Sequence, residues 1–294
     1  MAWLQLHIAT TEQQADGFQA ALETLGASAV TLTDGADQPL VEPPPGSRPL
    51  WQNTVVSALF DDDQDVEAIV AALKQQGLEV SAHHSERLED QAWERAWMAD
   101  FSPMQFGQRL WIIPSWSEPP DPDAVNLKLD PGLAFGTGTH ETTALCLEWL
   151  DQCDLDGSTR LLDVGCGSGV LAIAALLLGA DHGFGTDIDP QALLASRDNA
   201  EMNGVSERLS LFMPDTLPVD NGFDIVMANI LAQPLIDMAQ TMAKYCRPGG
   251  QLALSGILAT QAEAVRDAYA AWFTLNPTTI KGDWVRIDGV RRSD

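Results

Sequence analysis

The spacing of apolar residues in the first part of the chain predicts a small α+β domain. Apolar residues at every second position are typical of a half-buried strand, and apolar residues three and four positions apart are typical of one helix face. Each of the two helical patterns is followed by a glycine, Gly26 or Gly77, as expected at a helix end. This βαββαβ order is that of a ferredoxin-like domain, in which two helices cover one face of a small sheet. The predicted elements are a strand at Leu4–Ile8, a helix at Ala15–Leu25, strands at Val30–Leu32 and Thr54–Phe60, a helix at Val66–Leu73 and a strand at Leu78–Ala82.

The same patterns predict two boundaries. We assign residues 1–88 to the small domain, residues 89–102 to a helical linker and residues 103–294 to a larger α/β domain. The linker is charged and carries an aromatic residue at every fourth position, a stripe that we expect to pack against a domain. The small domain has no cluster of catalytic-type residues, and we interpret His83–His84 as the solvated end of a strand and not as a metal site.

The larger domain is organised around LLDVGCGSGVLAIAALLLGA, residues 161–180. A short apolar run, a glycine-rich turn and a long Ala/Leu-rich segment predict strand, turn and helix. The glycines Gly165, Gly167 and Gly169 have the spacing G-x-G-x-G, not the G-x-G-x-x-G of a dinucleotide fold. The tighter spacing lets the main chain lie against an uncharged or zwitterionic nucleoside. Asp187 ends the next predicted strand, where a carboxylate can accept hydrogen bonds from both hydroxyls of a ribose.

With Asp163 before the glycines, the turn D-x-G-x-G-x-G resembles that of the S-adenosylmethionine (SAM)-dependent methyltransferases. The resemblance implies SAM as cofactor, a Rossmann-like class I methyltransferase sheet, and a role for Asp187 at the ribose. Asp189 and Pro190 have a local explanation, because they form an N-cap and a first helical position.

Two further segments are expected at the same site. LDPGLAFGTGTHETT is interpreted as a loop over the cofactor, with Thr143 in the next helical turn near the methionine carboxylate. The alternative is a long glycine turn with Thr139 as N-cap, and His140 is a candidate base. FDIVMANIL predicts a buried strand that ends at Asn229, which would face the transferred methyl group unless it only terminates the strand. Asp215, after another strand, is a candidate partner of the adenine amine.

The motifs LDPGLAFGTGTHETT, DVGCGSG, DIDPQALLASRDNAEMNG and ANILA together resemble the ribosomal protein L11 methyltransferase (PrmA) family over essentially the whole chain. The resemblance implies trimethylation of the N-terminal α-amine and lysine ε-amines of a basic protein of the large ribosomal subunit. Residues 1–88 carry no recognisable chemistry and are joined through one predicted helix, so we expect them to bind the protein substrate while residues 103–294 catalyse the transfer, with Asn229 as the catalytic residue. At matching positions, the cofactor contacts are Thr143, Gly165, Asp187 and Asn229, beside Asp163 and Gly167 of the turn.

The residues after Asn229 are Ile230 and Leu231, where many amine methyltransferases have Pro-Pro-aromatic. This departure favours a flexible aliphatic amine. Methylation of an RNA ring amine is the alternative, but it would want an aromatic residue here and a basic surface. A non-catalytic SAM-binding module is another alternative, although it would have no need of Asp163, Asp187 and Asn229 together.

Composition and net charge limit the classes of binding partner that we expect. The chain has 294 residues, and 42 acidic against 16 basic residues give a formal net charge of −26. Such a surface repels phosphate backbones, so we expect no direct nucleic-acid binding and a basic protein partner, although the acidic residues could serve solubility alone. Four cysteines without a C-x-x-C pair indicate reduced thiols and no zinc site. No leader and no membrane-length apolar run are recognised, so we expect a cytoplasmic monomer.

Overall fold

The computed structural model describes residues 3–36, 50–88, 101–130, 140–218 and 222–293. The chain divides into two compact units, residues 1–100 and 101–294. Most of the predicted linker helix and most of the predicted loop LDPGLAFGTGTHETT lie outside the described residues, which leave out 89–100 and 131–139. No described helix has the length and apolar character needed to cross a membrane.

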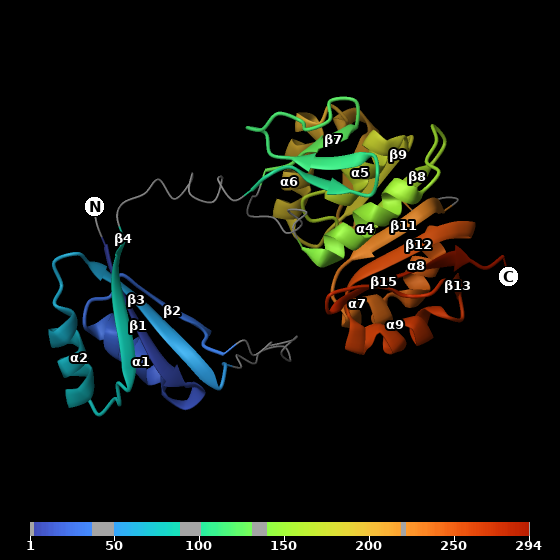
Figure 1. The fold of residues 1–294 in the computed structure, drawn as a ribbon. Helices are drawn as coiled ribbons and strands as arrows, with labels where there is room; N and C mark the ends of the chain where they lie inside the picture. Colours follow the sequence, from blue (N-terminus) through green and yellow to red (C-terminus); the bar gives the residue numbers. More distant parts are fainter. Residues whose placement is uncertain (1–2, 37–49, 89–100, 131–139, 219–221, 294) are drawn as a thin grey trace. The chain divides into compact units, whose positions relative to one another are not determined.

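The first unit is a four-stranded antiparallel sheet with two helices (Figure 1). The order of its elements is the predicted βαββαβ, and the strands lie in the order β2-β3-β1-β4. Alternate residues of β1 and β3, among them Leu6 and Phe60, pack with Phe18 of α1 in a core of this unit alone. The elements are β1 (Trp3–Thr11), α1 (Glu12–Thr24), β2 (Ala29–Asp34), β3 (Asn53–Asp61), α2 (Val66–Gln75) and β4 (Ala82–Leu88).

The predicted position of the fourth strand was wrong. Leu78 and Val80 pack against the core from a segment without strand pairing, and the paired strand is β4 (Ala82–Leu88). The side chains of β4 are almost all exposed, so the strand has no apolar alternation to reveal it. His83–His84 therefore lies within the strand, and the His84 ring stacks on that of His7 with centroids 4.4 Å apart. The described residues contain no cluster of three potential metal ligands.

The second unit is built on an eight-stranded sheet with the order β10-β9-β8-β11-β12-β15-β13, in which β14 pairs with β15. The five strands from β10 to β12 are parallel, and β15 is antiparallel to β12. The strand order reverses between β8 and β11, so a crevice is expected at the carboxyl ends of these two strands. The strands are β8 (Arg160–Val164), β9 (His182–Thr186), β10 (Leu209–Phe212), β11 (Phe223–Asn229), β12 (Cys246–Leu258), β13 (Phe273–Leu275), β14 (Thr279–Lys281) and β15 (Trp284–Arg291).

Helices cover both faces of this sheet, with α4 and α5 on one side and α7, α8 and α9 on the other (Figure 1). Successive residues of β8 point to opposite cores, Leu161 to the first and Leu162 to the second, which explains why neighbouring residues of the strand are both apolar. The helices are α4 (Glu141–Gln152), α5 (Val170–Leu178), α6 (Pro190–Met202), α7 (Ala232–Asp237), α8 (Ala239–Tyr245) and α9 (Ala262–Tyr269), with 3₁₀ turns at Ser206–Arg208, Pro214–Thr216 and Ala259–Gln261.

The segments before α4 form a separate small sheet of β5 (Met104–Phe106), β6 (Leu110–Ile113) and β7 (Val125–Lys128). The strands predicted at Arg109–Trp116 and Val125–Asp130 are therefore present as β6 and β7. The strand β5 was missed, because three residues are too few to show a period. The α/β class and the Rossmann-like sheet of the second unit are confirmed.

Candidate functional site

The glycine turn joins β8 to α5 and lies at the point where the sheet order reverses. Gly165, Gly167 and Gly169 all have positive φ, 72°, 54° and 77°, a conformation that favours glycine. The amide of Gly165 donates to the Thr186 carbonyl at 2.8 Å, which ties the turn to the end of β9. From α6, the Ser196 hydroxyl donates to the Gly167 carbonyl at 2.9 Å. The turn is thus held rigidly with its backbone close to the carboxyl ends of two strands.

Asp187 follows β9 and contacts the glycine turn directly. Its Oδ2 accepts a hydrogen bond from the Gly167 amide at 2.9 Å, and its Oδ1 accepts one from the Asp189 amide at 3.0 Å. Each carboxylate oxygen has a further lone pair, so Asp187 can still accept bonds from two ligand hydroxyls. Asp189 caps α6 by accepting from the Gln191 amide at 2.9 Å, as predicted.

Asp163 is the last polar residue of β8 before the turn, and it is 1% exposed. Neither carboxyl oxygen has a hydrogen-bond partner among the described residues. Burial raises the pKa of Asp163 to about 7, the nearby Ala172 amide opposes the rise, and the negative charge of Asp187 adds to it. A buried carboxyl group without a partner is costly. This group, with the glycine backbone and Asp187, fits a nucleoside that carries positive charge.

Asn229 and Thr143 meet although they are far apart in the sequence. Asn229 ends β11 and is half-buried, whereas Thr143 is buried in the first turn of α4. The Asn229 side-chain amide donates to Thr143 Oγ1 at 3.2 Å. This bond uses the amide nitrogen and does not involve Asn229 Oδ1. This oxygen is therefore available as an acceptor at the sheet's carboxyl edge.

His140 is the N-cap of α4, where the sequence suggested Thr139, which lies outside the described residues. Its Nδ1 accepts a hydrogen bond from the Thr142 amide at 3.3 Å and lies 2.8 Å from Thr142 Oγ1. The ring meets that of Trp284 edge-on, with centroids 4.9 Å apart. This cap gives His140 a structural task at the start of α4.

Three residues that follow strands of the main sheet have exposed side chains. Asp215 lies in the 3₁₀ turn that follows β10, as the sequence predicted. Ile188, next to Asp187, is 83% exposed, and Leu231 is 53% exposed. Sequence reasoning gave Ile188 no role, although a large apolar residue directly after a strand end and an acid is a usable signal. Single exposed apolar residues are common, so position at this edge is what distinguishes these two.

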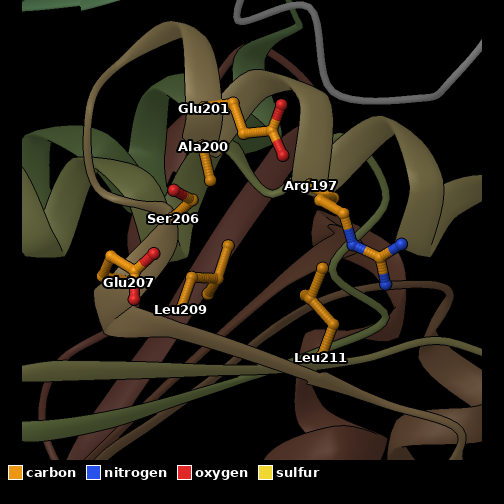
Figure 2. A pocket seen from close by; sticks show the side chains of 7 residues that line it. All are labelled: Arg197, Ala200, Glu201, Ser206, Glu207, Leu209 and Leu211. Carbon is orange, nitrogen blue, oxygen red and sulfur yellow. The ribbon is translucent and has the colours of Figure 1, made fainter.

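A separate hollow of about 230 Å³ lies at the edge of the sheet (Figure 2). Arg197 and Glu201 of α6 approach it from one side, and Leu209 and Leu211 of β10 line the other. It contains none of the predicted site residues, and Leu209 is at the amino end of its strand. We therefore place the functional site at the glycine turn and not here.

The reversal of strand order at β8 and β11, the glycine turn at that point and the acid after β9 define a class I SAM-dependent methyltransferase. The chain belongs to the ribosomal protein L11 methyltransferase (PrmA) family, whose family model matches residues 2–292.

Individual relatives agree with this assignment. A ribosomal protein L11 methyltransferase of Ectopseudomonas mendocina is 58% identical over 294 residues, covering 99% of this chain and all of the relative. The protein of the same name from Azotobacter vinelandii is also 58% identical, with the same coverage. A solved ribosomal protein L11 methylase from Lactobacillus delbrueckii subsp. bulgaricus is 32% identical with a TM-score of 0.59, covering 65% of this chain and 98% of that one.

Proposed function

We propose that the protein transfers methyl groups from SAM to the N-terminal α-amine and lysine ε-amines of ribosomal protein L11, three to each amine. The observation that carries the proposal is the Asn229–Thr143 pair, whose bond uses the amide nitrogen and leaves Asn229 Oδ1 as the acceptor for an amine, on the strand next to the glycine turn. The names of the relatives supply the substrate.

The proposed cofactor contacts follow from the geometry of the turn. The backbone of Gly165 and Gly167 lies against the nucleoside, and Asp187 accepts from the ribose hydroxyls. Asp163 supplies negative charge toward the cationic end of the ligand, and Thr143 lies near the methionine carboxylate. Bound SAM supplies a methyl group on positively charged sulfur, which is an activated donor.

The residues of the chain must then present a neutral amine. An unperturbed lysine is neutral about once in 2,500 at pH 7, which corresponds to about 4.6 kcal/mol. Removal from water beside a positive charge lowers the amine pKa and offsets part of this. In the first transfer, Asn229 Oδ1 would accept an N–H bond of the neutral amine and aim its lone pair at the methyl group, and before each later transfer the methylated ammonium would lose a proton to water. Because the donor is activated, this positioning suffices without a dedicated base.

In this proposal, the rest of the molecule binds the protein substrate. Residues 1–88 recognise L11, and the net charge of −26 favours a basic partner and disfavours nucleic acid. The enzyme acts as a monomer in the cytoplasm. The aliphatic pair Ile230–Leu231 suits the methylene stem of a lysine better than a planar ring amine.

Transfer of labelled methyl groups tests the proposal. The protein is incubated with labelled SAM and a ribosomal extract, and the labelled band and residues are identified by mass spectrometry. Trimethylated lysines and a trimethylated amino terminus on L11 are the expected result. Label on ribosomal RNA, or SAM binding without transfer to any protein, would contradict it.

A further inference from the structure

Gly256 lies in β12 where the strand bulges against β15, between Leu254 and Ile257. Its φ is +81°, and a Cβ at this position would lie 2.3 Å from the carbonyl oxygen of Ile230, 2.7 Å from its carbonyl carbon and 2.9 Å from its nitrogen. Such distances are well inside van der Waals contact, so only a residue without a side chain fits. The backbone of Ile230 is therefore seated directly on Gly256.

Ile230 is held from a second side by the glycine turn. A Cβ on Gly165 would lie 2.3 Å from Ile230 Cγ2, so the turn packs against the side chain as β12 packs against the backbone. Ile230 is the residue after Asn229, and Asn229 pairs in register with Ser255, the residue before Gly256. The two glycines thus fix the chain at the end of β11, one residue beyond the amide that bonds to Thr143.

We propose that Gly256 is a positioning residue for methyl transfer: by seating the backbone of Ile230, it sets where Asn229 presents its Oδ1 to the amine. The inference rests on the proposed role of Asn229. Oriented catalysis is sensitive to such placement, since a shift of about 1 Å can cost about 100-fold in rate. The left-handed backbone alone would also select glycine here, so the test must separate that requirement from the contact with Ile230.

Gly204 provides the matched control. Its φ is +66°, and an added Cβ would meet no atom within 4 Å. Gly204→Ala therefore introduces similar backbone strain without the contact. We expect Gly256→Ala to lower kcat for methylation of purified L11 by about 100-fold while the Kd for SAM stays within about threefold of the parent. Gly204→Ala should leave both within about twofold. Equal kcat in the two variants, or parallel losses of kcat and SAM affinity in Gly256→Ala, would overturn the proposal.

A second variant covers the case in which Gly256→Ala does not fold. Ile230→Ala shortens the side chain that packs on Gly165 and leaves Gly256 unchanged. Because Ile230 is only partly buried, this variant should remain folded. We expect kcat to fall about tenfold with SAM affinity within about threefold, since the strand end loses one of its two anchors. A parental kcat would overturn the proposal.

A spectroscopic readout keeps the inference separate from the proposed function. In ¹⁵N-labelled protein, the side-chain amide signal of Asn229 is assigned by its loss in Asn229→Ala. We expect this signal to shift in Gly256→Ala, or in Ile230→Ala if the first variant does not fold, and to stay in place in Gly204→Ala. An unchanged signal would overturn the positioning role even if L11 were not the substrate. A shifted signal in a protein that never methylates L11 would refute only the proposed function.

Discussion

Burial of the Asp163 carboxyl group lowers the stability of the ligand-free protein at neutral pH, although the proposed function uses this group. Its folded-state pKa, about 7, lies above the ordinary value near 3.9, so between about pH 4 and pH 7 the unfolded chain binds fewer protons than the folded chain. The free energy of unfolding must therefore fall as the pH rises through this window. Below about pH 4 the carboxyl group is protonated in both the folded and the unfolded chain, so it no longer lowers the free energy of unfolding. In the proposed function, the positively charged ligand interacts favourably with the ionised carboxylate and offsets this destabilisation.

Replacing Asp163 by Asn removes this titration with little change in shape. We expect the stability of Asp163→Asn relative to the parent to increase by about 2 kcal/mol between pH 5.5 and pH 8, since each pKa unit corresponds to about 1.4 kcal/mol. Urea unfolding of both ligand-free proteins at the two pH values measures the difference. Parallel pH dependence of the two proteins would show that Asp163 is already ionised at pH 5.5.

Substitution of Asn229 tests whether its Oδ1 acts in the transition state of methyl transfer. We expect Asn229→Ala to lower kcat by about 100-fold or more while SAM affinity falls by less than about tenfold, because the main proposed role of Asn229 is to orient the amine and its contact with the cofactor is secondary. Single-turnover methylation of L11 and calorimetry with SAM measure the two quantities. Thr143→Ser, which retains the hydroxyl partner of the amide, is the control and should keep most of the activity. Equal losses in kcat and affinity for Asn229→Ala would assign the residue to cofactor binding alone.

Among the elements, α4 carries both Thr143 and the histidine that begins it. The cap at His140 accounts for this residue without a role in proton transfer. We expect His140→Asn, which keeps a side-chain acceptor at the N-cap, to leave kcat within about threefold and the pH–rate profile unchanged. His140→Ala should lower the free energy of unfolding by about 1 kcal/mol through loss of the cap. A fall of 100-fold or more in the Asn variant, with loss of one limb of the profile, would identify a general base.

The sequence predicted the elements whose surroundings impose a pattern. The strand β11 is buried on both faces, so its apolar run and the polar Asn229 at its end could both be recognised in the sequence. The strand β4 is exposed and lies at the edge of its sheet, so its residues show no such pattern. The prediction therefore placed the strand at the preceding apolar residues Leu78 and Val80. Burial by neighbouring elements is what makes a strand recognisable.

Some residues of the candidate site could likewise be located from the sequence, and others could not. The residues of the turn follow one another, and Asp187 ends the next strand, so spacing alone located them. The bond from Asn229 to Thr143 joins positions 86 residues apart, and only the folded sheet brings them together. The contact of Gly256 with Ile230 is of the same kind, although a glycine inside a strand was an available signal of close backbone approach.

At the scale of the whole molecule, two units with separate cores carry one strongly acidic charge. Among the described residues, the core of residues 1–100 contains no residue of the second unit, and the two cores of the second unit contain none of the first. The glycine turn, Asp187 and Asn229 all belong to residues 101–294. In the proposed function, cofactor binding therefore requires only the second unit, whereas capture of a basic protein can draw on the acidic residues of both.

Removal of residues 1–88 tests this division of labour. We expect the remaining chain to bind SAM within about threefold of the parent, because every proposed cofactor contact is retained, and to lose at least about 100-fold in kcat/KM for L11. Calorimetry and labelled transfer measure the two effects, and circular dichroism checks that the shortened chain is folded. In the full-length protein, raising the salt from 50 to 300 mM should increase KM for L11 severalfold without changing SAM affinity, because screening weakens attraction between oppositely charged surfaces. A truncated protein that methylates L11 at the parental rate would refute recognition by residues 1–88, and a salt-independent KM would leave the acidic residues with solubility as their only role.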